Sequence, residues 1–166
     1  MRARTAFRHR AVTQRAFTLV ELLTALAVGA VMAMIAYPML ADAMTSQRLR
    51  ASGTDLMSSL LLARSEAIKR NANVEVRPKV GVDWASGWTV DAVATAEQFD
   101  AKDALGIRVK VQGAPPVLTY RGNGRLTTPG VARIAIADTD ARATTRCLVV
   151  DPSGVPTLSL GTGSLC

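Results

Sequence analysis

The sequence predicts an α+β protein in which one long N-terminal α-helix packs on a C-terminal antiparallel β-domain of two sheets. Three observations predict this fold. Residues 22–41 carry no charge, an amphipathic helical pattern follows them, and short alternating segments separated by Gly and Pro clusters complete the chain. We expect three parts: a leader at residues 1–16, the helix at 17–71 with a transmembrane half and an amphipathic half, and the β-domain at 72–166.

The uncharged stretch at residues 22–41 predicts a single membrane span. About 20 apolar residues in an α-helix match the roughly 30 Å hydrocarbon core of a bilayer. Five arginines lie in the first sixteen residues, which contain no acid. Because arginines beside a span are held on the cytoplasmic side, we expect a single-pass protein with a cytoplasmic N-terminus and an exported β-domain.

The net charge of +7 belongs mostly to this N-terminal tail. From Phe17 onward, 15 Lys and Arg stand against 13 Asp and Glu, which leaves a net charge of +2. A basic chain suggests a nucleic-acid partner, and a DNA-binding tail is the alternative interpretation. The position of the charge favours a topology signal instead.

Two cysteines, Cys147 and Cys166, lie late in the chain on the exported side of the span. An even number of cysteines in an oxidising compartment predicts one disulfide. It would close a loop of about 20 residues and contribute roughly 3 kcal/mol in the chain-entropy model. No metal site is expected, because these cysteines and the single His9 do not supply a ligand set.

Glu21 lies at the start of the hydrophobic segment, where an ionisable side chain is either at headgroup level or functional. Residues 16–21 read A-F-T-L-V-E and resemble the type III signal of type IV prepilins, G-F-T-L-[IV]-E. The resemblance implies cleavage between Ala16 and Phe17 by the inner-membrane prepilin peptidase, and N-methylation of Phe17. It also implies that Glu21 pairs with the N-terminal amine of a neighbouring subunit, which makes a buried charge tolerable. Ala16 stands where the family nearly always carries glycine.

The helix is predicted to continue well beyond the span. Pro38 removes a backbone donor inside the apolar run and should kink the helix there. Many type IV pilins carry a proline at the corresponding distance, whereas several secretion pseudopilins lack it. Residues with alternating spacings of four and three then mark a buried stripe: Leu49, Gly53, Leu56, Leu60, Ala63 and Ala67.

The end of the predicted helix carries a second resemblance. Residues 60–71 read L-L-L-A-R-S-E-A-I-K-R-N and are similar to the L-x-x-A-R-S-E-A-I-x-R stretch of the GspH/FimT group of minor pilins and pseudopilins. Arg64 and Glu66 are two residues apart and do not face each other on a helix, so we interpret them as surface or sheet contacts and not as a catalytic pair.

The rest of the chain predicts strands and turns. We expect Trp84 and Trp88 to pack in the core and not to form a ligand-stacking pair. Residues 92–103 are polar and alanine-rich and are predicted to form an exposed loop. The expected strands lie at residues 74–77, 87–90, 107–111, 117–120, 132–136, 147–150 and 157–160.

The exported domain offers little for catalysis. It has no histidine, so Ser-His and Cys-His nucleophile arrangements are excluded there. Asp138 and Asp140 share a predicted loop, but two carboxylates are too few for a calcium site. We expect no enzyme activity and no cofactor.

DNA binding is the alternative activity, because some FimT-like minor pilins serve DNA uptake through a basic C-terminal element, G-R-x-R. The matching stretch at residues 152–157 has the glycine but no arginine. Four arginines in or beside predicted loops would form a replacement phosphate-contacting patch, or else are dispersed solubilising charges: Arg121, Arg125, Arg142 and Arg146.

The leading hypothesis is a FimT-like minor pilin, built into or priming a type IV pilus. The alternative is a GspH-like minor pseudopilin of a type II secretion system. Either implies other pilins or pseudopilins, the prepilin peptidase and, before assembly, inner-membrane lipid as partners. The β-domain would then lie in the periplasm, on the membrane or in the filament.

Overall fold

The computed structural model describes residues 17–161 and 166; the predicted leader, Ala16 included, lies outside them. The chain divides into two compact units, one ending at Pro38 and one spanning Met39–Cys166. A single helix, α1 (Leu19–Arg70), runs through both. The expectation of one long N-terminal helix followed by strands is confirmed.

In the first unit, every described side chain is exposed. This part of α1 contains a window whose length and composition suffice to cross a membrane, with a mean hydropathy of 2.2 and none of its residues buried. A helix that is apolar on all sides and lacks protein cover is typical of a membrane or filament environment.

In the second unit, α1 is amphipathic. Its buried positions include all six residues of the predicted stripe. The helix ends in a Schellman motif. Asn71 adopts a left-handed conformation with φ of 49°, the Ala72 N–H donates to the Ala67 carbonyl, and the Asn71 N–H donates to the Ile68 carbonyl. This turn sends the chain back along the helix as the first strand.

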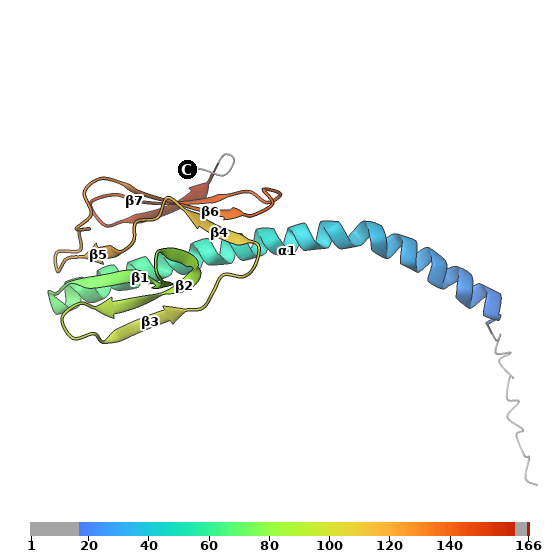
Figure 1. Ribbon diagram of the computed structural model, residues 1–166, viewed down its shortest axis with the longest axis horizontal. Coiled ribbons are helices and arrows are strands. Elements are labelled where there is room, and N and C mark those ends of the chain that lie inside the picture. The colour runs from blue at the N-terminus through green and yellow to red at the C-terminus, as the bar shows by residue number, and fades with distance from the viewer. Residues whose placement is uncertain (1–16, 162–165) are drawn as a thin grey trace, which may run out of the picture. The chain divides into compact units, whose positions relative to one another are not determined.

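The strands form two antiparallel four-stranded sheets (Figure 1). Sheet A has the order β3-β2-β1-β5 and sheet B the order β4-β6-β7-β8. Sheet A contains β1 (Val74–Val80), β2 (Asp83–Ala92), β3 (Gln98–Lys102) and β5 (Leu118–Tyr120). Sheet B contains β4 (Val109–Gln112), β6 (Ala132–Asp138), β7 (Arg146–Val150) and β8 (Pro156–Leu160).

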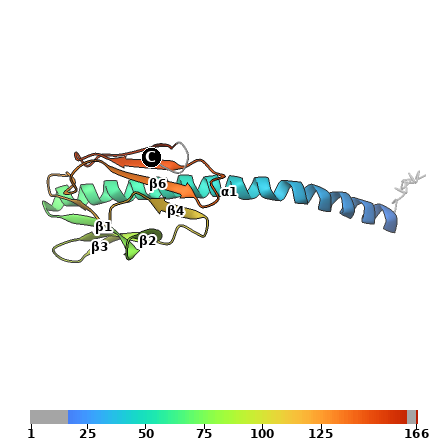
Figure 2. The ribbon, with the colours of Figure 1, turned by 45° about the horizontal axis from the view of Figure 1, so that its top comes forward.

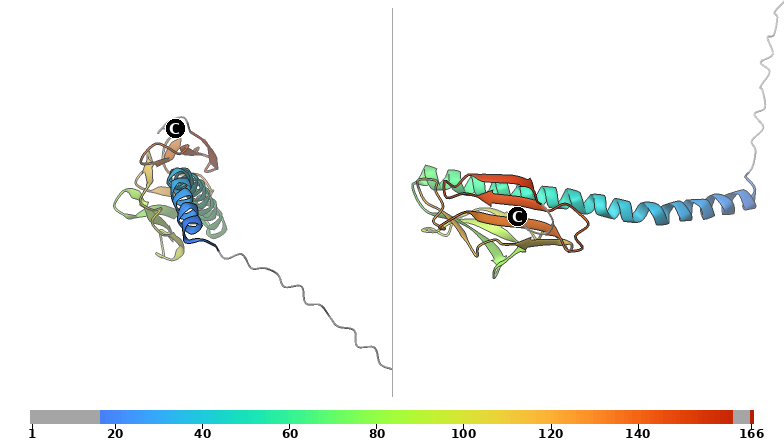
Figure 3. Two further views of the ribbon diagram at one scale, coloured as in Figure 1. Left: turned by 90° about the vertical axis from the view of Figure 1, so that its right-hand side faces the viewer. Right: turned by 90° about the horizontal axis from the view of Figure 1, so that it is seen from above.

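Both sheets pack on the second half of α1, as the turned views show (Figures 2 and 3). On the side of sheet A, the buried Ser59 hydroxyl donates to Asp100 Oδ2 at 3.1 Å. On the side of sheet B, a Cβ built on Gly53 would lie 3.1 Å from Leu158 Cδ1, so only a small residue allows this approach. Trp84 and Trp88 are buried in the core, as predicted.

Two strand predictions were wrong. Residues 98–102 form β3 inside the predicted loop, because β3 is an edge strand whose partly exposed, charged side chains hide the alternation. The strand expected at residues 107–111 begins only at Val109, and the Ile107 side chain is 95% exposed.

The predicted disulfide between Cys147 and Cys166 is present, with the two Cα atoms 5.5 Å apart. It fastens the last residue of the chain to β7. The Cys166 Sγ also lies 3.4 Å from the Ile134 carbonyl of the neighbouring β6.

Candidate functional site

The start of α1 is fixed by Thr18. The Thr18 Oγ1 accepts a hydrogen bond from the Glu21 N–H at 3.2 Å, and the Thr18 carbonyl accepts one from the Leu22 N–H at 3.1 Å. A side-chain oxygen in this position satisfies one of the free donors of the first turn. Our sequence reasoning missed this role, although Thr-x-x-Glu is the spacing of a capping box.

The cap places Glu21 in the first turn of the helix. A carboxylate is favoured there, because the helix N-terminus carries a partial positive charge. Glu21 is also the only charged residue between Phe17 and Ala41. The described residues of the first unit, 17–38, therefore form an apolar helix without protein cover, which we call the apolar rod. It carries one acid, one turn from the residue that the signal predicts as the mature N-terminus.

Small side chains leave a groove along one face of this rod. Glu21, Ala25 and Gly29 follow each other at intervals of four and line a groove together with Phe17 and Val28. A Cβ built on Gly29 meets nothing within 4 Å. Small residues spaced by four allow close approach of a second helix in apolar surroundings. The face that carries Glu21 is therefore suited to helix–helix contact.

Pro38 lies inside α1 and is the last residue of the first unit. Its ring nitrogen has no hydrogen to donate to the Met34 carbonyl, so the helix lacks one backbone hydrogen bond there. The predicted kink residue thus coincides with the boundary between the uncovered and the packed half of the helix.

A cluster of charges lies a short way beyond this boundary, inside the second unit. Its centre is the Arg108 guanidinium, whose Nη2 is 3.6 Å from Asp42 Oδ1, 3.1 Å from Asp138 Oδ2 and 3.3 Å from Asp140 Oδ2. Arg142 Nη1 lies 4.0 Å from Asp42. The cluster links α1 to the residue preceding β4 and to the loop between β6 and β7.

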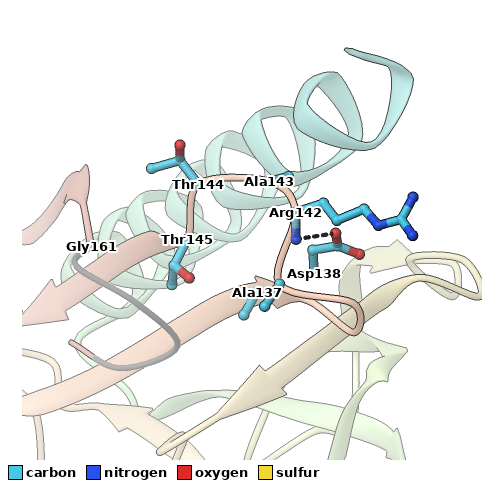
Figure 4. A pocket seen from close by; sticks show the side chains of 8 residues that line it. Ala137, Asp138, Arg142, Ala143, Thr144, Thr145 and Gly161 are labelled. Atoms are coloured by element: carbon cyan, nitrogen blue, oxygen red, sulfur yellow. Dashed lines mark hydrogen bonds between the residues drawn. The ribbon is translucent and has the colours of Figure 1, made fainter. Parts of the chain in front are cut away.

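Asp138 is the buried member of this cluster. Its carboxylate accepts hydrogen bonds from the backbone N–H groups of Arg142, at 3.0 Å, and Asp140, at 3.4 Å. Figure 4 shows the first of these bonds. Burial by itself raises the pKa of Asp138, but the N–H donors of Arg142 and Asp140 and the Arg108 guanidinium outweigh it and hold the pKa below its usual value.

The four arginines considered for DNA do not form one patch. Arg121 and Arg125 lie in the turn after β5, before β6 begins, whereas Arg142 and Arg146 follow the end of β6. The seven residues of β6 separate the two pairs by about 20 Å at the rise of a β-strand. Arg142 also faces Asp42. Hydrogen bonds from Ser153 are the main cause of the lowered pKa of Asp151, and the nearby Arg125 lowers it further.

The charged residues near the end of α1 bind within the domain, as predicted for Arg64 and Glu66. Arg64 Nε donates to the Gly124 carbonyl at 3.1 Å. Glu66 accepts from Lys69 Nζ at 3.0 Å and from Arg70 Nε at 3.1 Å. The Arg64 bond ties the helix end to the turn after β5, whereas the Glu66 contacts lie within α1.

Comparison with protein families gives two matches. Residues 52–154 match the family model of the type II transport protein GspH, and residues 12–37 match the prokaryotic N-terminal methylation motif. The first match begins inside the packed half of α1 and covers strands β1 to β7. The second contains the cap, Glu21 and the apolar rod. No match was found among curated proteins.

Two solved structures with this fold are crystal forms of the type IV minor pilin FimU of Pseudomonas aeruginosa. The first is 23% identical, with a TM-score of 0.58 over 69% of this chain and 98% of that one. The second is 22% identical, with a TM-score of 0.56 over 70% of this chain and 90% of that one. With its GspH and methylation-motif matches and this pilin-like fold, the chain belongs to the GspH family of type IV minor pilins and pseudopilins.

Proposed function

We propose that this protein is a minor type IV pilin that assembles through the first half of α1 into a pilus, or primes the assembly of one. The observation that carries the proposal is the bare apolar rod of residues 17–38, which has one acid, Glu21, in its capped first turn. Such a rod needs apolar surroundings, and the Glu21 charge needs a cationic partner in them.

The proposed partner of Glu21 is the amine that cleavage after Ala16 would create on Phe17 of a neighbouring subunit. In the membrane, the rod would anchor the precursor with residues 1–16 in the cytoplasm and the β-domain in the periplasm. In the filament, the groove along Glu21, Ala25 and Gly29 would receive the helix of a neighbour. The proposed role is structural, with no enzymatic step, and the prepilin peptidase is the processing partner.

The first test is mass spectrometry of the protein from cells that contain a prepilin peptidase. We expect a mature chain that begins with N-methylated Phe17. Retention of residues 1–16 in those cells would contradict the proposal. Ala16→Gly is the matched variant, since it restores the residue usual at this position, and it should be cleaved at least as fast.

The second test separates processing from assembly. Glu21→Val leaves the cleavage position and the Thr18 cap in place but removes the charge, so we expect normal cleavage with loss of the protein from sheared filament fractions. Leu26→Val, on the same helix but outside the groove of Glu21, is the control and should stay in the filaments. Normal recovery of the Glu21→Val protein in filaments would remove Glu21 from the mechanism.

A minor pseudopilin of a type II secretion system is the second candidate, and the family match to the type II transport protein GspH favours it. Pro38 favours the pilus, because several secretion pseudopilins lack a proline at this distance. Deletion of the gene distinguishes the two. Loss of surface pili with normal export of secreted enzymes supports the pilin, and the reverse result supports the pseudopilin. The separation of the four arginines gives no support to a DNA-uptake role, which we do not propose.

A further inference from the structure

At one end of the second unit, apolar side chains are exposed around the charge cluster of Arg108. Three lie on α1, at Met39, Leu40 and Met44, and the fourth is Ile107. Ile107 is 95% exposed, more than any other large hydrophobic residue described. Scattered exposed apolar residues are ordinary, but a group around one site marks an interaction surface.

The local backbone holds Ile107 outward. The Val109 N–H donates to the Gly106 carbonyl at 3.2 Å, which closes a turn with Ile107 at its tip, and Gly106 has a φ of +100°. The Thr139 N–H donates to the Arg108 carbonyl at 3.0 Å and ties this turn to the β6–β7 loop. Turn tips usually carry Gly, Pro, Asn, Asp or Ser. A β-branched apolar residue there contributes nothing to the core of its own domain.

The neighbouring Arg108 fixes the position of Ile107 along α1. Its guanidinium reaches Asp42, which directly follows the uncharged stretch of residues 22–41. The turn therefore lies beside the point where the chain leaves its apolar run. Asp42, Asp138 and Asp140 surround Arg108, so the positive charge next to Ile107 is neutralised within the protein.

We propose that the turn Gly106–Val109 is a second membrane contact, in which Ile107 enters the interfacial region of the bilayer beside the span and seats the β-domain on the lipid surface. The partner is the phospholipid headgroup layer, where apolar side chains insert. The inference rests on the membrane anchoring that is part of the proposed function.

The test uses the full chain in vesicles of phosphatidylethanolamine and phosphatidylglycerol. Ile107→Cys is labelled with an environment-sensitive fluorophore; Cys147 and Cys166 are joined in the disulfide and do not react. Val155→Cys is the control, because Val155 is also exposed but lies in the turn after β7, at the opposite end of sheet B. We expect blue-shifted emission at position 107, quenched by spin-labelled lipid, and neither effect at position 155.

Flotation of the same vesicles separates the two proposals. If the chain floats with the lipid but the label at position 107 behaves like the one at 155, the membrane contact is overturned and the anchor stands. If the chain does not float, the anchoring in the proposed function fails, and the membrane contact with it. A last arm dilutes the protein below one chain per vesicle. If the emission of the label at position 107 stays blue-shifted, the contact is with lipid. If the blue shift disappears, the membrane contact is overturned and the surface binds a second copy of the chain.

Discussion

The two halves of α1 form one continuous helix, but their side chains require opposite surroundings. From Leu19 to Pro38, every side chain is exposed and Glu21 is the only charge. From Met39 to Arg70, a buried stripe faces the two sheets, and no charged residue is among its buried positions. Both halves are α-helical, so the difference lies in what the side chains require around them.

One helix thus serves two environments. The second half is stabilised by the β-domain that it carries, as is usual for a helix in a folded domain. The described residues of the first half have no such cover, and in the proposed function lipid or neighbouring subunits would supply it. Changes in the second half should therefore alter the unfolding of the domain, and equivalent changes in the first half should alter only insertion and assembly.

The largest expected effect on stability is that of Leu60→Ala. Leu60 is fully buried, and truncation of a buried leucine leaves a cavity that costs about 3 kcal/mol. Trp84 and Trp88 both lie in the β-domain, so denaturant unfolding of the full chain in detergent, followed by tryptophan fluorescence, measures the loss. Leu26→Ala in the exposed half should leave this transition unchanged. Equal shifts for the two variants would refute the division of α1.

The next effect concerns the charge cluster beyond Pro38. Asp138→Asn keeps an acceptor oxygen but removes the negative charge that faces Arg108 and two backbone N–H groups, so we expect a loss of about 2 kcal/mol. The same unfolding measurement checks it. Thr139→Ala, on the exposed neighbour, is the matched control and should change little.

The pH dependence of this effect has a definite sign. The pKa of Asp138 is lowered in the folded state, so the stabilisation by its charge is present above the unfolded pKa of about 3.9 and is lost as the pH falls through the folded pKa. The difference in unfolding free energy between the native protein and Asp138→Asn should be constant near pH 7 and shrink below about pH 4. A constant difference down to pH 2 would contradict the assigned role.

A glycine pair tests helix packing more finely. Gly53→Val brings a branched side chain against Leu158 and the Arg146 Cβ, and overpacking of this kind costs about 1.5 kcal/mol. Gly29→Val meets nothing within 4 Å and should not alter domain unfolding. Recovery in sheared filament fractions should show the reverse order: Gly29→Val should reduce it more than Gly53→Val, because Gly29 lies in the groove with Glu21. If Gly53→Val leaves the unfolding transition of the domain unchanged, α1 can move away from sheet B.

The smallest effect on stability is expected for Pro38→Ala. The alanine supplies the missing N–H to the Met34 carbonyl, outside the packed core, so domain unfolding should change by less than about 0.5 kcal/mol. Circular dichroism in detergent should show slightly more helix. A large loss of domain stability would show that Pro38 contributes to the packing of the β-domain.

Local patterns in the sequence predicted most of the fold. The spacing of Leu49, Leu56 and Leu60 identified the buried face, and Gly and Pro clusters separated most of the strands. The edge strand β3 was missed because Phe99 is its only large apolar residue and its other side chains are partly exposed. At the candidate site, the signal motif identified Glu21, whereas the Thr18 cap was overlooked in the same six residues.

The charge cluster could not be predicted in this way. Asp42, Arg108 and Asp138 are far apart in the sequence, and only the pairing of β4 with β6, and their packing near α1, bring them together. The separation of the four arginines could not be predicted for the same reason. Arg125 and Arg142 are seventeen positions apart in the chain, but β6 runs between them and carries them to opposite ends of sheet B.

The way in which α1 enters the β-domain has a mechanical consequence. A pull on the N-terminal end of the chain reaches the domain through α1 alone, along the helix axis. The buried side chains that resist this pull extend from Thr45 to Ala67, about six helical turns, so they are loaded together in shear and not one at a time. The disulfide joins β7 to the chain end and lies outside this load path. In a filament subunit built in this way, α1 would separate from the β-domain only when all the buried residues of the stripe slide together.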